Sequence, residues 1–377
     1  MAKQKVKGIN LKRENVNRLL AWWNVIVEWS RKRWAEKRNR PWIVGAGGVC
    51  VVVVLFATWI FWWPNSFSNP DSRVINVSRG DSFARVVDSL YAQGIIGSKT
   101  SIKIAGRILG GATELKVGRY TFAGGVSNLS IIRDLREGNR TLIPVSIPEG
   151  IRMTTVARRL SKELGVDSAK VMELCLDSAV AVAWGIPDLS VEGYLLPDTY
   201  FFHWQTDERD LVERFLQAFR EFYVDSLQAR ASQLGMTTHQ ILTFASIVDR
   251  ETQIPDERPV VAGVYHNRLK RRMRLEADPT IQYILPDGPR RLLYSDLRVP
   301  SRYNTYRNYG LPPGPIGNPG REAILATLYP TEHQYYYFVA DGRGGHTFTK
   351  TYEEHQRAVR VYRRVRREMQ RETTLGR

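Results

Sequence analysis

The feature that most constrains this chain is an uncharged, apolar segment that runs from Trp42 to Trp63. As an α-helix the segment would extend about 33 Å, which is enough to cross the hydrocarbon core of a bilayer. Tryptophans lie at both ends of the segment, where the two interfaces of a membrane favour them. We therefore predict a transmembrane helix over residues 42–63.

The positive charge of the chain is concentrated before this segment. The net charge is +17, and residues 1–40 contribute +9 of it, from 12 Lys/Arg and three Glu. The positive-inside rule then places residues 1–41, a basic arm, in the cytoplasm and the chain after residue 63 outside the inner (plasma) membrane. Because membrane orientation explains more than half of the charge, we do not expect a nucleic-acid partner.

A cleaved signal peptide is the alternative to a membrane anchor. The arm is too long for one, the apolar run exceeds the usual length of about 7–15 residues, and no small-residue cleavage site follows it. Within the arm, apolar residues at 19–27 recur at helical spacing. They predict either a helix on the anionic inner leaflet or a docking helix for a cytoplasmic partner. Cys50 and Cys175 would lie in different compartments, so we expect no disulfide between them.

The exported part of the chain divides into a turn-rich linker at 64–73 and two folded regions. The first region, at 74–140, has the pattern of a small α+β module, and we expect binding rather than catalysis from it. Asp81 or Ser82 can cap its first helix, which Gly94 ends. The expected elements are strands at 74–77 and 118–122, and helices at 83–93, 100–109 and 127–136.

The second region, at 141–350, also mixes helices and strands, so the predicted fold class is α+β throughout. A strand is expected at 142–147, followed by a helix that Thr154 caps and Gly165 ends. The glycines at 342–345 predict a tight turn between strands. A charged helix with a basic bias is expected at 352–372, inside a C-terminal segment at 351–377.

Several catalytic classes have no support in the sequence. There is no G-x-S-x-G motif of a serine hydrolase, and the six histidines form no close metal-binding pair. The glycines at 342–345 lack the Lys-Ser/Thr pair that a phosphate-binding loop carries. We therefore expect neither a metal nor a cofactor. The candidate catalytic groups are carboxylates.

Glu251 is the carboxylate whose position is most informative. It follows Phe244, Ile247 and Val248 at spacings of seven, four and three residues, so it extends an apolar stripe at the C-terminal end of a helix that Thr238 can cap. Desolvation and the negative end of the helix dipole both raise the pKa of such a carboxyl, which suits a proton donor near neutral pH. Asp249 points about 200° away from Glu251 and cannot share one bond with it.

Three loop segments rich in Pro, Gly, Asn and Tyr accompany this helix in the sequence. They lie at 191–200, 303–306 and 310–316. Aromatic rings together with amide and hydroxyl groups suit a polar sugar polymer. The same composition is also typical of an aromatic core with rigid turns, and composition alone leaves both interpretations open.

Residues 191–349 resemble the YceG-like family of endolytic murein transglycosylases, and weaker similarity begins at about Val74. The basic arm is outside the resemblance. Seven motifs occur in the family's order: EGYLLPDTY from Glu192, ASIVDRET from Ala245, ERPVVAGVYHNRL from Glu257, MRLEADPT from Met273, YNTY from Tyr303, GLPPGPIGNPG from Gly310 and YFVADGRGGHTF from Tyr337.

The resemblance implies a LysM-like module at 74–140 that contacts glycan, and a YceG-like catalytic domain at 141–350. It implies a membrane-anchored lytic transglycosylase that acts in cell wall assembly and glycan strand termination, with Glu251 as the catalytic residue. The implied reaction cleaves the β-1,4 bond between N-acetylmuramic acid and N-acetylglucosamine. Glu251 protonates the leaving oxygen and then takes the proton of the muramyl C6 hydroxyl, which closes on C1 to give a 1,6-anhydro end. The substrate supplies the nucleophile, so no second carboxylate is needed.

The resemblance also implies residues that orient the substrate: Glu192, Glu276, Asp278, Asn304 and Tyr306. Glu276 stands where the family usually has Gln, and Asp249 stands where many members have Glu. An added carboxylate at 276 would either raise the pKa of Glu251 further or bind an amide or amine of the substrate. The sequence leaves both roles open.

Two other functions compete with this one. A muramidase that uses water would need a second carboxylate, such as Asp278 or Glu192, at a suitable distance from Glu251. A membrane-anchored murein-binding scaffold would work through residues 74–140 and would not need Glu251. In each case the expected partners are peptidoglycan strands and the inner membrane. Peptidoglycan synthases and division proteins are a further hypothesis, motivated by the cytoplasmic arm.

Overall fold

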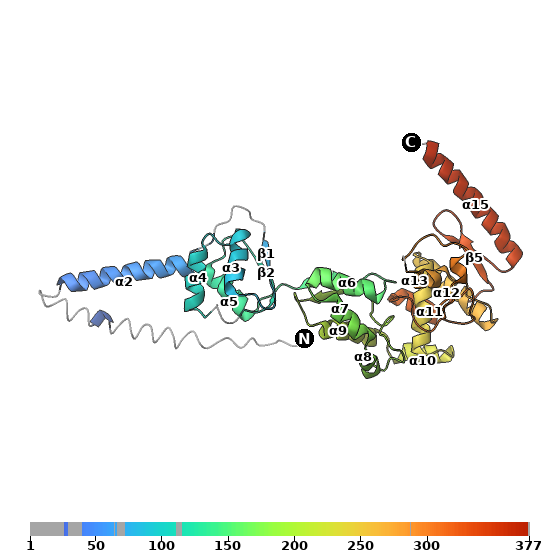
Figure 1. Ribbon diagram of the computed structural model, residues 1–377, viewed down its shortest axis with the longest axis horizontal. Coiled ribbons are helices and arrows are strands. Elements are labelled where there is room, and N and C mark those ends of the chain that lie inside the picture. The colour runs from blue at the N-terminus through green and yellow to red at the C-terminus, as the bar shows by residue number, and fades with distance from the viewer. Residues whose placement is uncertain are drawn as a thin grey trace, which may run out of the picture. The chain divides into compact units, whose positions relative to one another are not determined.

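The structure is a computed structural model that describes residues 26–28, 40–63, 65, 72–110, 115–286 and 288–375. It forms two compact units, Met1–Arg140 and Thr141–Arg377 (Figure 1). The helix expected at 19–27 and the linker expected at 64–73 lie almost entirely outside the described residues.

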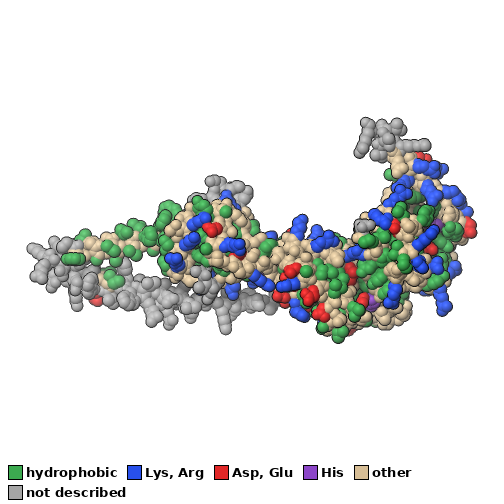
Figure 2. Space-filling view, in the orientation of Figure 1, with side chains coloured by type: hydrophobic (Ala, Val, Ile, Leu, Met, Phe, Trp, Pro, Cys, Tyr) green, Lys and Arg blue, Asp and Glu red, His purple; other side chains and the backbone are tan. Residues whose placement is uncertain are grey.

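The predicted apolar helix is present as α2 (Arg40–Phe61). Its segment Val44–Phe61 has a mean hydropathy of 2.4 and is long and apolar enough to cross a membrane. Hydrophobic side chains cover this helix in Figure 2, and they are largely exposed. Its last turn is different, because Ile60 is buried and its carbonyl accepts a 2.8 Å hydrogen bond from Nδ2 of Asn128.

The rest of the first unit has the predicted order of elements. Strands β1 and β2 pair antiparallel, and three helices pack on them around one apolar core. Ser82, rather than Asp81, caps the first of these helices by accepting from the Arg85 amide at 3.3 Å. The elements are β1 (Arg73–Val77), α3 (Phe83–Ala92), α4 (Lys99–Ile108), β2 (Gly118–Phe122) and α5 (Asn128–Glu137).

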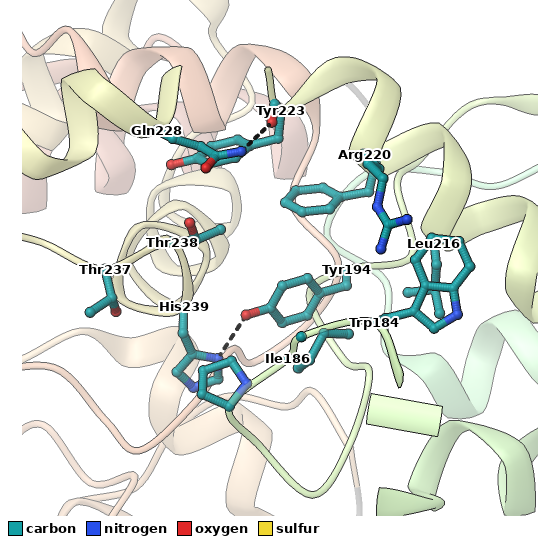
Figure 3. Close-up of a pocket in the computed structure, with 13 residues that line it drawn as sticks. Trp184, Ile186, Tyr194, Leu216, Arg220, Tyr223, Gln228, Thr237, Thr238 and His239 are labelled. Atoms are coloured by element: carbon teal, nitrogen blue, oxygen red, sulfur yellow. Dashed lines mark hydrogen bonds between the residues drawn. The ribbon is translucent and has the colours of Figure 1, made fainter. Parts of the chain in front are cut away.

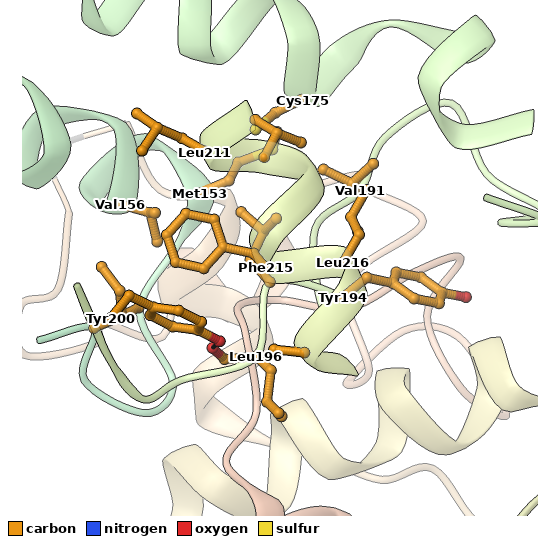
Figure 4. Close-up of a cluster of buried hydrophobic side chains, with 14 of the residues drawn as sticks. Met153, Val156, Cys175, Val191, Tyr194, Leu196, Tyr200, Leu211, Phe215 and Leu216 are labelled. Atoms are coloured by element: carbon orange, nitrogen blue, oxygen red, sulfur yellow. Dashed lines mark hydrogen bonds between the residues drawn. The ribbon is translucent and has the colours of Figure 1, made fainter. Parts of the chain in front are cut away.

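The second unit begins with a helical layer beside a two-stranded antiparallel sheet, β3–β4. Its core is drawn in Figure 4, where Phe215 meets the ring of Tyr200 edge to face at a centroid distance of 4.5 Å. The elements are β3 (Ile143–Ser146), α6 (Met153–Leu164), α7 (Ser168–Leu176), α8 (Ser178–Ala183), β4 (Thr199–Phe202), α9 (Glu208–Phe222) and α10 (Asp225–Gln233).

The start of α6 corrects one expectation. Thr154 does not cap this helix but lies inside its first turn, and the residue at the cap position is Arg152, whose side chain makes no capping bond. A distant carboxylate replaces the local cap, because Glu192 accepts a hydrogen bond from the Met153 amide at 2.9 Å. Gly165 ends the helix in the left-handed conformation, as predicted.

The second half of this unit is built on α11, which packs against α12, α13 and α14. Strands β5 and β6 form the predicted hairpin around the glycine-rich turn, and α15 packs against it. Basic side chains are prominent along α15 in Figure 2. The elements are α11 (Thr238–Glu251), the 3-10 turn η2 (Pro255–Glu257), α12 (Arg258–Lys270), α13 (Asp278–Ile284), the 3-10 turn η3 (Asp296–Arg298), α14 (Arg321–Leu328), β5 (Tyr337–Ala340), β6 (His346–Thr349) and α15 (Tyr352–Leu375).

The mixed α+β class is therefore confirmed. The described residues contain three separate two-stranded antiparallel sheets, so helices supply most of both cores. Cys50 lies in α2, Cys175 is buried in the second unit, and both are free thiols.

Candidate active site

Glu251 is the last residue of α11, where the apolar stripe predicted it. Phe244, Ile247 and Val248 on the preceding turns are all fully buried and share one core cluster. The helix begins one residue earlier than expected, because Thr237 rather than Thr238 is the cap. Thr237 and Gln240 hold each other's backbone amides in a capping box, which fixes the start of the helix.

Tyr265 holds the Glu251 carboxyl group in place. Its hydroxyl donates a hydrogen bond to Oε1 of Glu251 at 2.6 Å. Tyr265 comes from α12 and is only 1% exposed, with its ring edge-on to Phe244 and Phe338. These ring contacts hold the phenol in place, and its hydrogen bond anchors Oε1 of Glu251.

The surroundings of Glu251 favour its protonated form. Burial is the main cause and raises the pKa of Glu251 from 4.5 to about 7. The hydrogen bond from Tyr265 lowers that pKa, the charge of Asp278 raises it, and the charge of Arg268 lowers it. Part of the side chain nevertheless stays exposed. An accessible carboxyl group with a pKa near 7 can both give and take a proton at neutral pH.

Arg268, three residues after Tyr265 on α12, organises the backbone beside the site. Its guanidinium is buried and donates to the carbonyls of Tyr336 at 2.7 Å and Leu275 at 2.9 Å. It also lies 3.3 Å from Oε2 of Glu276. The residue at 276 therefore pairs with a cation, and it sits in the left-handed region at φ +50°.

Asp278 and Tyr306 form a second hydrogen-bonded pair near Glu251. The Tyr306 hydroxyl donates to Oδ1 of Asp278 at 2.5 Å. Asp278 is exposed and is the first residue of α13. Burial, followed by the hydrogen bond to Asp278, raises the pKa of Tyr306, so its phenol remains a donor. Of the two carboxylates considered from sequence, Asp278 is the one whose charge raises the pKa of Glu251.

Asn304 is fully buried, and its side-chain amide makes hydrogen bonds within its own loop. Nδ2 donates to the carbonyls of Leu297 at 3.0 Å and Val299 at 2.8 Å, and Oδ1 accepts from the Tyr306 amide at 2.9 Å. In this structure Asn304 positions the backbone of Tyr306. Any effect of Asn304 on a ligand would therefore be transmitted through Tyr306.

Glu192 belongs to a different group of side chains. It is 5% exposed and accepts hydrogen bonds from the Met153 amide at 2.9 Å and from the Tyr283 hydroxyl at 3.0 Å. Burial is the largest influence on its pKa and raises it. The structure thus brings Asp278, Tyr306 and Glu276 to the Glu251 end of α11, whereas Glu192 links the start of α6 to Tyr283 of α13.

Asp249 lies on the opposite side of α11 from Glu251, as its spacing indicated. It is 2% exposed, its Oδ1 is 3.3 Å from Nη2 of Arg258, and burial raises its pKa to about 6. Arg258 also pairs with Glu149 at 2.8 Å and with Glu322 at 3.0 Å. This network joins α11, α12, α14 and the turn before α6, so its role is structural.

The sequence analysis missed two residues of the site, Tyr265 and Arg268. Both lie in the motif that begins at Glu257, and their spacing of three residues places them on one face of α12. Their shared face, inside a motif that the resemblance had singled out, was the available signal. Among the described residues, no group of three or more His, Cys, Asp or Glu is arranged to hold a metal ion.

Comparisons with known proteins point to one family. The model of the YceG-like family matches residues 75–361. An endolytic murein transglycosylase of Bacillus subtilis (strain 168) is 30% identical over 304 residues, which cover 76% of this chain and 84% of that protein. A protein of the same name from Streptococcus pneumoniae (strain R6) is 28% identical over 282 residues, or 66% of this chain and 50% of that protein. The crystal structure of a YceG-like protein from Listeria monocytogenes superposes with a TM-score of 0.56 at 28% identity, covering 77% of this chain and 99% of that one.

The raised pKa of Glu251 predicts a pH-dependent stability. Between pH 4.5 and about 7 the folded protein keeps a proton on Glu251 that the unfolded chain has released. The stability that this group contributes is therefore present below pH 4.5 and is lost as the pH rises to about 7. Glu251→Gln keeps the acceptor for Tyr265 but removes the titration. We expect the variant to exceed the wild type by up to about 3 kcal/mol at about pH 8, and to match it at about pH 4.

The measurement is the free energy of unfolding of the full chain in detergent micelles, from denaturant titrations at both pH values. Glu332→Gln, at an exposed position of the same unit, is the matched control and is expected to change neither value. A Glu251→Gln effect of equal size at both pH values would show that the group does not titrate in this range.

Proposed function

Because this chain belongs to the YceG-like family, we propose that it is a membrane-anchored lytic transglycosylase that cleaves the glycan strands of peptidoglycan. The bond cleaved is the β-1,4 link between N-acetylmuramic acid and N-acetylglucosamine, and the product carries a 1,6-anhydro end. The relatives of this chain in Bacillus subtilis and Streptococcus pneumoniae are named endolytic murein transglycosylases, which supports the proposal. Its role in the cell would be to terminate glycan strands during wall assembly.

The observation that carries the proposal is the protonation chemistry of Glu251. A carboxyl group with a pKa of about 7, oriented by Tyr265, is suited to act first as an acid and then as a base. It gives its proton to the oxygen between the two sugars as the bond from that oxygen to C1 breaks. The resulting carboxylate takes the proton of the muramyl C6 hydroxyl, whose oxygen bonds to C1. Glu251 ends protonated, and no water is consumed.

The other residues of the site would position the substrate. Asp278 and Tyr306 present a carboxylate and a phenol beside Glu251, and Glu276 presents an exposed carboxylate held by Arg268. Such groups suit the hydroxyl and acetamido groups of a polar sugar chain. We propose that Asn304 acts indirectly, through Tyr306, and that Glu192 acts indirectly, through the start of α6.

A muramidase that uses water is the second candidate, and one observation favours it. Asp278 lies close enough for its charge to raise the pKa of Glu251, so a second carboxylate is present. In that reaction Asp278 would activate water, and the product would carry a reducing end. A non-enzymatic scaffold, working through the LysM-like module that we propose at 74–140, is the third candidate.

The product of murein cleavage decides among the three candidates. We would incubate purified murein with the full chain in detergent, as wild type, Glu251→Gln and the exposed control Glu332→Gln, and analyse the products by mass spectrometry. We expect anhydro-muramyl ends from the wild type and the control, and a rate lowered about 10²- to 10⁴-fold in Glu251→Gln. Reducing ends would establish hydrolysis instead. Murein binding without cleavage by any of the proteins would establish the scaffold.

Tyr265 provides a test of the proton donor itself. Glu251 must be protonated in the free enzyme, so kcat/KM is expected to fall as the pH rises through about 7. The hydrogen bond from Tyr265 lowers the pKa of Glu251, so Tyr265→Phe raises that pKa and moves the falling limb upward by about one pH unit. Tyr309→Phe, at an exposed ring, is the control and leaves the limb in place. A limb that stays fixed in Tyr265→Phe would assign it to another group.

Membrane anchoring belongs to the same proposal. The apolar helix α2 supplies the span, and the basic arm before it favours a cytoplasmic N-terminus, with both folded units outside. The test is labelling of spheroplasts with an impermeant maleimide, in a chain whose two native cysteines are replaced. A single cysteine at the exposed position Leu189 is expected to react before lysis, and one at Ser30 only after lysis. The reverse order would invert the topology.

A further inference from the structure

A pocket lies at the opposite end of α11 from Glu251. Its volume is about 400 Å³, within the range of small-ligand sites, and the segment after α8, helices α9 and α10, and the start of α11 surround it. Figure 3 shows Arg220 and Trp184 on one side of this space and Thr237, Thr238 and His239 on the other. The chemistry proposed above does not use this pocket, because no acid lines it.

The walls of the pocket combine ring faces with neutral and cationic donors. The guanidinium of Arg220 lies 4.3 Å from the ring centroid of Trp184. Tyr194 packs edge-on against Phe219 at 5.3 Å. Among the described residues that line the pocket none is acidic, and the nearby carboxylate of Asp188 lies 3.8 Å from His239. A ligand that suits these walls has flat apolar faces, amide or hydroxyl groups, and no net positive charge.

His239 is held in place by two contacts, one at each ring nitrogen. Its Nε2 lies 3.0 Å from the carbonyl of Pro313, which can only accept, so this nitrogen is the donor. Nδ1 lies 3.2 Å from the hydroxyl of Tyr194. These contacts hold His239 and Tyr194 in place, so this wall of the pocket is preformed. Arg220 is the Arg or Lys side chain that lines the pocket.

One loop connects this pocket to the Glu251 end of α11. Tyr306 binds Asp278 near Glu251, and Pro313 contacts His239 at the pocket. Further along the chain, the Ile316 amide donates to Oγ of Ser246, in the middle of α11, at 3.0 Å. Along the helix axis the distance from the pocket to Glu251 is about 20 Å at 1.5 Å per residue. A rigid helix and a loop bound along it therefore hold the two sites at a fixed spacing.

We propose that this pocket binds a second disaccharide-peptide unit of the glycan strand that Glu251 cleaves. The inference rests on the proposed function, because it takes the substrate to be a strand that extends beyond the scissile bond. Sugar rings offer apolar faces to Trp184, acetamido groups match the threonine hydroxyls, and the peptide carboxylates match Arg220. A strand that fills both sites binds through two linked contacts, so strands that are too short to span them are cleaved less efficiently.

The test compares long glycan strands with a tetrasaccharide too short to reach the pocket, using the full chain in detergent. The variants are Trp184→Ala and Arg220→Gln. Because Trp184 also packs on the core, the exposed Arg220 keeps the test valid if Trp184→Ala misfolds. Arg209→Gln, an exposed position on the same helix that does not line the pocket, is the matched control.

We expect the wild type and Arg209→Gln to prefer long strands over the tetrasaccharide. Each pocket variant is expected to lower kcat/KM for long strands about tenfold, toward the value for the tetrasaccharide. An unchanged preference for long strands in Arg220→Gln would overturn the inference while leaving the proposed function intact. If the wild type cleaves neither the long strands nor the tetrasaccharide, the proposed transglycosylase function is wrong. Cosedimentation with murein then decides the inference, which is overturned if Arg220→Gln binds as tightly as the wild type.

Discussion

The burial of α11 is the constraint on which the second unit depends. Every residue from Ile241 to Asp249 is buried, so this helix meets solvent only near its ends. Its C-terminal end places a carboxyl group where protein replaces most of the water, and this desolvation raises the pKa of Glu251. The same burial requires a partner for Asp249, which Arg258 supplies from α12. A single helix thus sets both the chemistry of the site and the ion network behind it.

The features that the sequence predicted are those that depend on spacing along the chain. The apolar stripe through Phe244 and Ile247 located Glu251, and the i, i+2 spacing separated it from Asp249. The glycine-rich turn predicted the hairpin between β5 and β6, and Gly165 predicted the end of α6. These patterns are local, because helix period and backbone conformation are decided within a few residues. The motif resemblance supplied the catalytic role that we propose for Glu251, which spacing alone left open.

The features that the sequence did not predict are contacts between distant segments. Tyr265 reaches Glu251 from the next helix, and Glu192 replaces a local cap at α6 from 39 residues away. Asn304 lies in a tyrosine-rich loop and could have faced a ligand, yet its amide is used inside that loop. Tertiary packing decides such pairings, and the periodicity within one segment does not predict which distant residues it will contact.

The left-handed conformation of Glu276 has a consequence for how this position can change. A side chain in that region costs about 1 kcal/mol relative to glycine. The carboxylate recovers a similar amount at most, because it is about half exposed and a pair such as that with Arg268 contributes roughly 0–1 kcal/mol. The two contributions nearly cancel, so the free energy of folding hardly distinguishes Glu from Gly at position 276. Under the proposed function, the charge at 276 acts mainly through the ligand, so this is a position where specificity can drift without loss of the fold.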